Sequence, residues 1–435
     1  MFGRKESRAI LWLGFEKMAA LGLSFLATIV VARHLGPANL GILASGLAIV
    51  SILSPLASLL IDKALVRRFS REPEQRDYLL FLARHIVVRA SILTFLVGLV
   101  LIAILSTSSD GTSGLRFLVG LSALLSLLIF PFLVPLRSFC ESITNGKILA
   151  TSNLSGSVGA SLFRLVMVAI GAPLPLFAFS GAVGAALSAG VLRAHFGRIG
   201  KWFLPDFKAA RREKTFLAEG SILAFAALTN LIHRNVDIIM VERLANSTEA
   251  GNYAASARLA EITYLIPVIL ATVYLPLLSR SRDNASSFHN STLNFFRLNT
   301  LFALVITMAG LLCGKPIIDL LYGSQFSMVG TIFLIHIASI WFIFIDHAKG
   351  TVLTSNRGNP VVIWCNAIAI TVNVGLNFLL IPKYGGIGAA SATFVSYSLI
   401  GAILPFLFAE TRKLARMQIR ALISPIQVLG QLRSS

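Results

Sequence analysis

Charged residues are scarce in this sequence. Only 13% of its 435 residues are Asp, Glu, Lys or Arg, and the acidic ones number 19. Soluble domains carry about 25% charged residues, so a chain of this size with half that share cannot cover itself with polar surface in water. The composition therefore excludes a soluble globular protein.

Cysteine is rare too, and the motifs of catalysis are missing. Cys140, Cys313 and Cys365 each lie in or beside an apolar stretch, without the paired spacing of a disulfide framework or a zinc site. We expect all three to be small buried hydrophobes. The sequence holds no nucleophile triad, metal-ligand cluster or phosphate-binding glycine loop. We therefore expect no enzyme, no cofactor and no bound metal.

Apolar residues make up 56% of the chain and gather in runs long enough to cross a bilayer. A transmembrane helix needs about 20 apolar residues, so twelve of them would take roughly 240 positions, close to the observed hydrophobic share. We therefore predict an all-α polytopic membrane protein with about 12 transmembrane helices. The first six are expected at 10–33, 37–61, 84–106, 115–136, 148–171 and 176–196, and the second six at 216–242, 250–278, 296–321, 326–348, 360–381 and 386–409.

Lys and Arg predict the orientation of these spans. If the N-terminus lies inside, 28 of the 38 basic residues fall in inward segments, five fall in outward loops and five fall within spans. Lys349 is counted with an inward loop, and Asp346 and His347 are expected at the membrane interface. Positive residues in short loops stay on the cytoplasmic side, so both termini are predicted to be cytoplasmic. The net charge of +19 is thus a topology signal, and no nucleic acid partner is expected.

Long loops are also absent between the expected spans. A membrane polymerase or ligase usually needs a sizeable extramembrane loop or domain that carries its catalytic groups, and no outward loop here is of that size. The segments 201–214 and 412–433 mix basic with apolar residues, a pattern typical of interfacial helices on anionic membrane lipids.

The two halves of the chain resemble each other weakly. Residues 29–41 match 239–251 at an offset of 210, and residues 181–186 match 385–390 at an offset of 204. Six spans per half would make this a parallel repeat, although small residues at helix contacts would explain the matches equally well. We predict an N-terminal lobe at 1–205, a C-terminal lobe at 206–411 and a basic cytoplasmic tail at 412–435.

Several ionisable residues fall within expected spans, where each costs about 2.5 to 3.5 kcal/mol unless it is paired or faces a polar cavity. Asp237 follows Arg234 by three residues, and Glu261 follows Arg258 by three. Each of these two pairs could equally be an ion pair that only stabilises helix packing. Apart from Asp346, the ionisable residues within expected spans are Glu16, Lys17, Arg164, Arg234, Asp237, Arg258 and Glu261.

The three arginines of this set are candidates for one substrate-binding site. Arg234 and Arg258 lie at a similar depth, about 13 Å from the outward ends of their spans, and Arg164 is slightly shallower. We predict that the three line a cationic cavity that binds an anionic substrate. Glu261, Asp237, Glu16 and Lys17 are candidates for ion coupling or for ion pairs.

Three stretches resemble the polysaccharide transporter family, the O-antigen and exopolysaccharide flippases of the superfamily that also holds multidrug and toxin extruders. The last stretch is the most specific, because it combines two asparagines, a proline and a glycine cluster at fixed spacing. The resemblance extends from about residue 10 to about residue 410 and is carried by residues 31–41 (VARHLGPANLG), by residues 237–240 followed by 251–258 (GNYAASAR), and by residues 373–390 (NVGLNFLLIPKYGGIGAA).

This resemblance implies two six-helix lobes in a V-shaped, MATE-like exporter fold in the bacterial inner membrane. It implies a flippase that moves undecaprenyl-diphosphate-linked oligosaccharide to the periplasmic leaflet by alternating access, for O-antigen, exopolysaccharide or capsule biosynthesis. By position, Arg258 is the best match to the family's basic cavity residues. Coupling to protons or sodium, and partnership with a polysaccharide polymerase and chain-length machinery, are left open.

Two other functions stay open at this point. A multidrug or cation antiporter of the same superfamily would need an acidic or apolar cavity, whereas each acid of the two arginine pairs has a basic neighbour and Arg164 has no local acid. A membrane enzyme of glycan assembly, either a polymerase or a ligase, is the second alternative.

Overall fold

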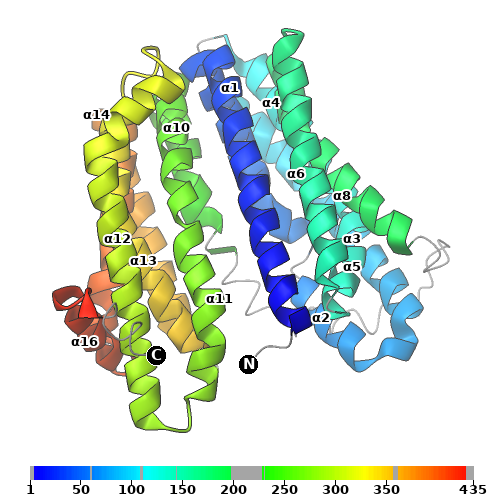
Figure 1. Ribbon diagram of the computed structural model, residues 1–435. Coiled ribbons are helices and arrows are strands. Elements are labelled where there is room, and N and C mark those ends of the chain that lie inside the picture. The colour runs from blue at the N-terminus through cyan, green and yellow to red at the C-terminus, as the bar shows by residue number, and fades with distance from the viewer. Residues whose placement is uncertain are drawn as a thin grey trace. The chain divides into compact units, whose positions relative to one another are not determined.

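The computed structural model describes residues 4–427 apart from 59–60, 108–110, 144, 197–227, 230 and 356–360. Helix follows helix through these residues, and no strand occurs among them (Figure 1). This confirms the all-α class, which follows from apolar runs that must satisfy every backbone hydrogen bond within one segment.

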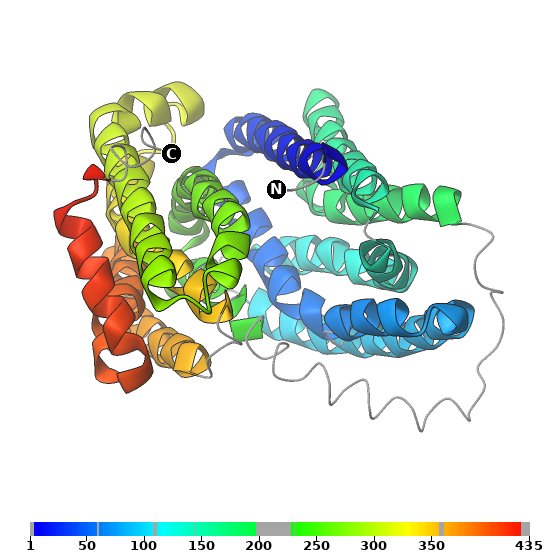
Figure 2. The ribbon, with the colours of Figure 1, turned by 60° about the horizontal axis from the view of Figure 1, so that its bottom comes forward.

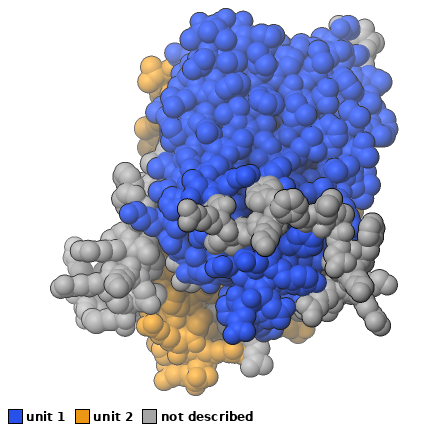
Figure 3. Space-filling view, turned by 90° about the vertical axis from the view of Figure 1, so that its right-hand side faces the viewer, with its two compact units in different colours: residues 1–239 blue, residues 240–435 orange. Residues whose placement is uncertain are grey.

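The chain divides into two compact units, Met1–Ile239 and Met240–Ser435, which Figure 3 shows in different colours. The lobe boundary predicted at residue 205 falls in the stretch 197–227, outside the described residues. The predicted lobes of 1–205 and 206–411 therefore stay a prediction.

The first unit is built from helices of unequal length joined by short turns. Its elements are α1 (Arg4–Ala57), α2 (Asp62–Arg71), η1 (Pro73–Gln75), α3 (Arg76–Ser106), α4 (Ser113–Leu124), η2 (Leu125–Ile129), α5 (Phe130–Ser142), α6 (Gly146–Ala169), α7 (Leu174–Ala178) and α8 (Ser180–Phe196).

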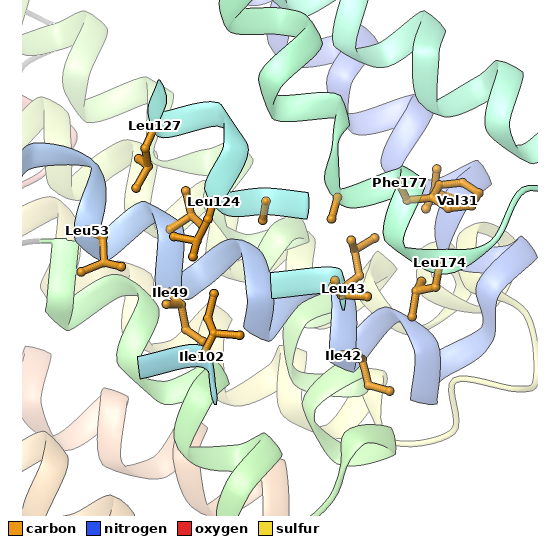
Figure 4. Close-up of a cluster of buried hydrophobic side chains, with 14 of the residues drawn as sticks. Val31, Ile42, Leu43, Ile49, Leu53, Ile102, Leu124, Leu127, Leu174 and Phe177 are labelled. Atoms are coloured by element: carbon orange, nitrogen blue, oxygen red, sulfur yellow. The ribbon is translucent and has the colours of Figure 1, made fainter. Parts of the chain in front are cut away.

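Helix α1 contains the first two expected spans, which meet at Gly36. This residue has φ 72°, a left-handed conformation that glycine adopts at little cost, and Pro37 follows it. Beyond this kink the helix contributes to an apolar core shared with α3, α4, η2 and α7 (Figure 4). Leu124, Leu127 and Phe177 are among its fully buried side chains.

Small residues bring α6 and α8 together, and the two helices lie side by side in Figures 1 and 2. A Cβ on Gly156 would lie 2.7 Å from the carbonyl oxygen of Gly184. The hydroxyls of Ser152 and Ser188 each donate to the other residue's carbonyl oxygen at 2.9 Å. Close packing of this kind explains why the expected span 148–171 is rich in Ser and Gly.

The second unit starts within the helical stretch 231–244, of which residues 231–239 belong to the first unit. Its further elements are α10 (Ser247–Thr263), α11 (Leu265–Arg280), α12 (Ala285–Tyr322), α13 (Val329–Ser355), α14 (Val361–Ser398), the π-helical η4 (Leu399–Ile403), α15 (Leu404–Leu407) and α16 (Ala409–Ile423).

The sequence stretch 373–390 lies at a kink inside α14. Gly385 has φ 54°, and a Cβ there would lie 2.6 Å from Glu249 Oε2. The same carboxylate accepts a hydrogen bond from the backbone N–H of Gly386 at 2.9 Å. The glycines of this stretch are therefore needed for the approach of α10 to the kink.

The first part of the predicted tail is the amphipathic helix α16, which packs on the second unit. Met417 and Ala421 are buried in a cluster with Phe295 of α12. Gln418 Nε2 donates to the Ile345 carbonyl oxygen at 3.1 Å. The opposite face is basic and exposed, as an interfacial helix requires, and consists of Arg412, Lys413, Arg416 and Arg420. The other segment expected at the interface, 201–214, lies outside the described residues.

Eight helical stretches in the described part of the chain are long and apolar enough to cross a membrane. Helix α1 covers most of the first two expected spans, and α14 covers most of the eleventh and the first half of the twelfth. Helix α6 is not among the eight, and the seventh expected span, 216–242, lies partly outside the described residues. The count of twelve and the cytoplasmic termini stay predictions.

Candidate functional site

Helix α10 carries the candidate Arg258 together with its acidic neighbour. The helix begins at Asn246, whose side-chain oxygen accepts a hydrogen bond from Glu249 N at 2.8 Å. Arg258 Nη1 lies 2.8 Å from Glu261 Oε2, so the expected i, i+3 ion pair is present. The Arg258 side chain is 53% exposed and that of Glu261 24%. A ligand can therefore reach the guanidinium without unfolding the helix.

A buried polar layer lies on the same helix, one to two turns before this pair. The Tyr253 ring packs edge-on against the imidazole of His336 on α13, with the centroids 5.2 Å apart. The Tyr253 hydroxyl lies 3.5 Å from Thr393 Oγ1 on α14. This layer thus joins three helices of the second unit.

Three polar atoms of this region have no hydrogen-bond partner among the described residues. They are His336 Nε2, Asn252 Oδ1 and Ser256 Oγ, and each belongs to a side chain at most 4% exposed. Leaving a buried polar group unsatisfied costs about 1–3 kcal/mol. Buried polar groups without partners are therefore expected where a ligand, an ion or a proton has a role.

The two asparagines of residues 373–390 are also buried. Asn377 Nδ2 donates to Asn373 Oδ1 at 3.3 Å and contacts Met240 Sδ at 3.7 Å. Both side chains have 0% exposure. Their spacing of four residues thus places them on one face of α14 inside the second unit.

Arg164 lies on α6 in the first unit. Its Nε donates to Ser180 Oγ at 2.8 Å, and Ser180 is fully buried at the start of α8. The hydrogen bond fixes the stem of the guanidinium against the helix pair. The side chain is half-buried.

The other candidates lie in the stretch 231–244 and near the N-terminus. Arg234 is exposed, whereas Asp237 is buried at 2% exposure. The side chains of Glu16 and Lys17 lie outside the described residues. Because Arg164 and Arg234 belong to the first unit and Arg258 to the second, the shared cationic cavity stays a prediction.

One buried charge was missed at the level of the sequence. Lys349 lies inside α13 and not in a loop, and its side chain is 3% exposed. Its Nζ lies 2.9 Å from Asp346 Oδ1 and donates to the carbonyl oxygen of Ile400 in η4 at 2.6 Å. The i, i+3 spacing of Asp346 and Lys349 was the available signal, but the expected span ended before Lys349, which was predicted in an inward loop, with Asp346 at the membrane interface.

The cysteines follow the prediction in part. Cys140 and Cys365 are buried, but Cys313 is exposed, so the expectation of burial is wrong for it. An apolar run predicts insertion into the bilayer, and a residue on the lipid-facing side of a helix is exposed in the isolated chain. No group of three or more His, Cys, Asp or Glu that could hold a metal occurs in the described part of the chain.

One family model matches this chain. It is described as polysaccharide biosynthesis protein and matches residues 7–282, more than half of the sequence. Among curated protein sequences, none matches.

Solved structures resemble the chain over nearly its whole length. A lipid II flippase MurJ in an inward closed conformation has TM-score 0.77 and 15% identity, covering 96% of this chain and 92% of that one. An inward-facing MATE family multidrug transporter has TM-score 0.73 and 10% identity, with 95% and 96% covered. A MOP superfamily transporter from Pyrococcus furiosus, described as having a binding pocket of reverse polarity, has TM-score 0.65 and 12% identity, with 96% of both covered. Likeness at these identities establishes the fold, that of the MATE-like exporters.

Proposed function

The chain belongs to the polysaccharide biosynthesis protein family, and from that membership we propose that it is a flippase for lipid-linked oligosaccharide. Its substrate is an undecaprenyl-diphosphate-linked saccharide, which moves from the cytoplasmic to the periplasmic leaflet of a bacterial inner membrane by alternating access. The product serves surface polysaccharide synthesis.

The observation that carries this proposal is the half-exposed guanidinium of Arg258 on a helix of an apolar bundle. It lies eleven residues after the start of α10, or about 16 Å along the axis, which is near the middle of a bilayer core about 30 Å thick. A charge at that depth is costly and is usually retained for function. Arginine pairs with phosphate oxygens through two parallel hydrogen bonds, so a diphosphate is a suitable ligand.

Export of such a lipid is favoured by the membrane potential. A diphosphate diester carries negative charge, and moving each charge outward across an inside-negative membrane gains about 2.3 kcal/mol per 100 mV. The proposal therefore needs no cofactor and no covalent chemistry from the protein.

The test is a leaflet-exchange assay on purified protein in liposomes, with a fluorescent undecaprenyl-diphosphate-linked saccharide. We expect the native chain to flip the lipid and Arg258→Ala to slow it by about 10- to 150-fold, since a hydrogen bond to a charged group contributes about 1.5–3 kcal/mol. Lys413→Ala, which removes one exposed charge from α16, is the matched control and should flip at the native rate.

Two results would contradict the proposal. One is a native chain that reconstitutes well but flips no diphosphate-linked saccharide. The other is Arg258→Ala that flips at the native rate. Tight binding of organic cations that depends on Glu261 would instead support the multidrug antiporter.

A further inference from the structure

Lys349 of α13 supplies a hydrogen bond to the backbone of the π-helical turn η4. Its Nζ donates to the carbonyl oxygen of Ile400 at 2.6 Å. In this turn the N–H of Leu404 bonds to the carbonyl of Leu399, five residues back, whereas in an α-helix it would bond to the carbonyl of Ile400. The π-helical pattern therefore leaves the Ile400 carbonyl to the N–H of residue 405.

Residue 405 is a proline, which has no N–H to donate. In the π-helical register the carbonyl without a backbone donor is that of Ile400. In an α-helical register the Leu404 N–H would bond to Ile400, and the carbonyl of Gly401 would lack its donor instead. Pro405 thus leaves one carbonyl without a backbone donor in either register. The ammonium group of Lys349 bonds to the carbonyl that the π-helical register leaves over.

The packing of α13 holds this ammonium group in place. A Cβ on Gly401 would lie 3.0 Å from the carbonyl oxygen of Phe342, so only glycine lets η4 come this close to the backbone of α13. The Lys349 side chain is 3% exposed, and its Nζ lies 2.9 Å from Asp346 Oδ1 on the other side. A hydrogen bond from a charged donor is about twice as strong as a neutral one. Lys349 is therefore the group that favours the π-helical register.

The chain after η4 is free to turn as a short piece. Helix α15 ends at an extended residue, Phe408, with φ −97° and ψ 130°, so it is not continuous with α16. Thr411 Oγ1 donates to the Pro405 carbonyl at 2.9 Å and has the Phe408 carbonyl as a second acceptor at 3.4 Å. The bond from Arg412 Nε to the Phe406 carbonyl is exposed, where water can replace it. These contacts therefore do not lock α15 in one orientation.

We propose that η4 is a two-register switch, which Lys349 holds in the π-helical register. When the ammonium group leaves the Ile400 carbonyl, the Leu404 N–H transfers to it from the Leu399 carbonyl, and the turn becomes α-helical. Residues 404–407 then advance by one position and rotate by about 100° relative to α14. Alternating access needs elements with two discrete arrangements, and this segment provides one within the second unit. The inference goes beyond the proposed function and does not depend on its substrate.

The exposure of residue 403 reports the register. The Ile403 side chain is 50% exposed, whereas that of Leu404 is 5% exposed. In the α-helical register each residue takes the place that the following residue holds now, so residue 403 becomes buried. A cysteine is small and apolar enough for either place.

The test measures how fast Ile403→Cys reacts with a thiol-reactive fluorescent dye, in the full chain in detergent and well below the unfolding temperature. Cys313 is exposed and is first replaced by serine. Cys140 and Cys365 are buried, and their slow reaction is measured in each background without Ile403→Cys and subtracted.

The native background is compared with Lys349→Met and with Lys349→Met combined with Asp346→Leu, which leaves no stranded carboxylate. Lys413→Met removes an exposed ammonium group from α16 and is the matched control. Leu379→Cys, at a position 67% exposed on α14, is the control site for labelling.

We expect both Lys349 variants to slow the labelling of residue 403 by at least about twofold and at most about 150-fold. A hydrogen bond to a charged group changes an equilibrium by about 10- to 150-fold, and without it each register leaves one carbonyl unsatisfied, so the commoner α-helical geometry prevails. Lys413→Met should label as the native chain does, and Leu379→Cys should label alike in every background. A loss of stability alone would open the structure and speed the labelling, so a slower rate distinguishes a register change from mere destabilisation.

Three results would overturn the inference. One is a folded Lys349 variant in which residue 403 labels within about twofold of the native rate, or faster. Another is a fall that occurs equally at Leu379→Cys, because it would then not report the register. The third is an equal fall in Lys413→Met. If Lys349→Met alone does not fold, the combined variant with Asp346→Leu decides by the same criteria.

Discussion

The buried lysine of α13 offers a sharp test of how this bundle tolerates charge. Lys349→Met keeps the length and apolar stem of the side chain but removes its ammonium group. The substitution deletes the contact to Asp346 at 2.9 Å and the hydrogen bond to the Ile400 carbonyl at 2.6 Å. Asp346 is then left as an unpaired carboxylate beside an apolar helix contact.

The structure sets the size of the effect. Removing one partner of a buried ion pair costs about 3–5 kcal/mol. The Asp346 side chain is 28% exposed and keeps some solvation, so we expect the lower end, about 3 kcal/mol. Adding Asp346→Leu removes the stranded charge and leaves only the Ile400 carbonyl without its donor, a loss of about 1 kcal/mol. The double variant should therefore be more stable than Lys349→Met alone, by about 2 kcal/mol.

The assay is thermal unfolding in detergent followed by a dye that fluoresces on reaction with thiols. Cys365 and Cys140 are buried and react only when the chain opens, whereas Cys313 is exposed and is first replaced by serine. For a unit of about 200 residues, 3 kcal/mol corresponds to a Tm lower by roughly 6–12 °C. We expect Lys349→Met to show this fall and the double variant to recover most of it.

Two outcomes would refute the reasoning. If Lys349→Met melts with the native chain, the ammonium group does not stabilise the fold through this pair. If the double variant melts as low as the single one, the stranded carboxylate is not the cause of the loss.

Three further substitutions test the packing of the helices, with the same unfolding assay. Gly385→Ala should lose about 1–3 kcal/mol, because φ is 54° and the new Cβ meets a glutamate of α10, whereas Gly375→Ala, with open space around it, should stay within about 0.5 kcal/mol. Gly156→Ala should lose about 1–3 kcal/mol because α6 cannot then approach α8, and Gly190→Ala on the open side of α8 is its control. Asn246→Ala removes the N-cap of α10 and should lose about 1 kcal/mol; equal melting of native and variant would show that the cap contributes nothing.

Much of this fold could be predicted from the order of residues alone. Bilayer insertion depends on the apolar character of a stretch about 20 residues long, which is a local property. The expected spans 84–106 and 296–321 each fall within one helix, whereas 115–136, 176–196 and 250–278 are each divided between successive helices. The pairing of Arg258 with Glu261 was also predictable, because residues three apart on a helix are neighbours whatever surrounds them.

Burial of individual side chains could not be predicted in this way. Lys349 and His336 are buried because α13 packs against α10, α11, α12, α14 and η4. Cys313 has apolar neighbours in the sequence yet is exposed. Which side of a helix faces its partners depends on its rotation in the bundle, and an apolar span lacks the polar face that would reveal this rotation.

The sequence by itself thus determined the class of the protein, its approximate spans and the family it resembles, because these depend on composition and short motifs. Only the tertiary structure decided that Tyr253 packs on the imidazole of His336, that α16 packs on the second unit, and that Lys349 bonds to the π-helical turn. The physical reason is that these contacts join residues that are distant in the chain. Their energy depends on distances of a few ångströms, which a local sequence pattern cannot predict.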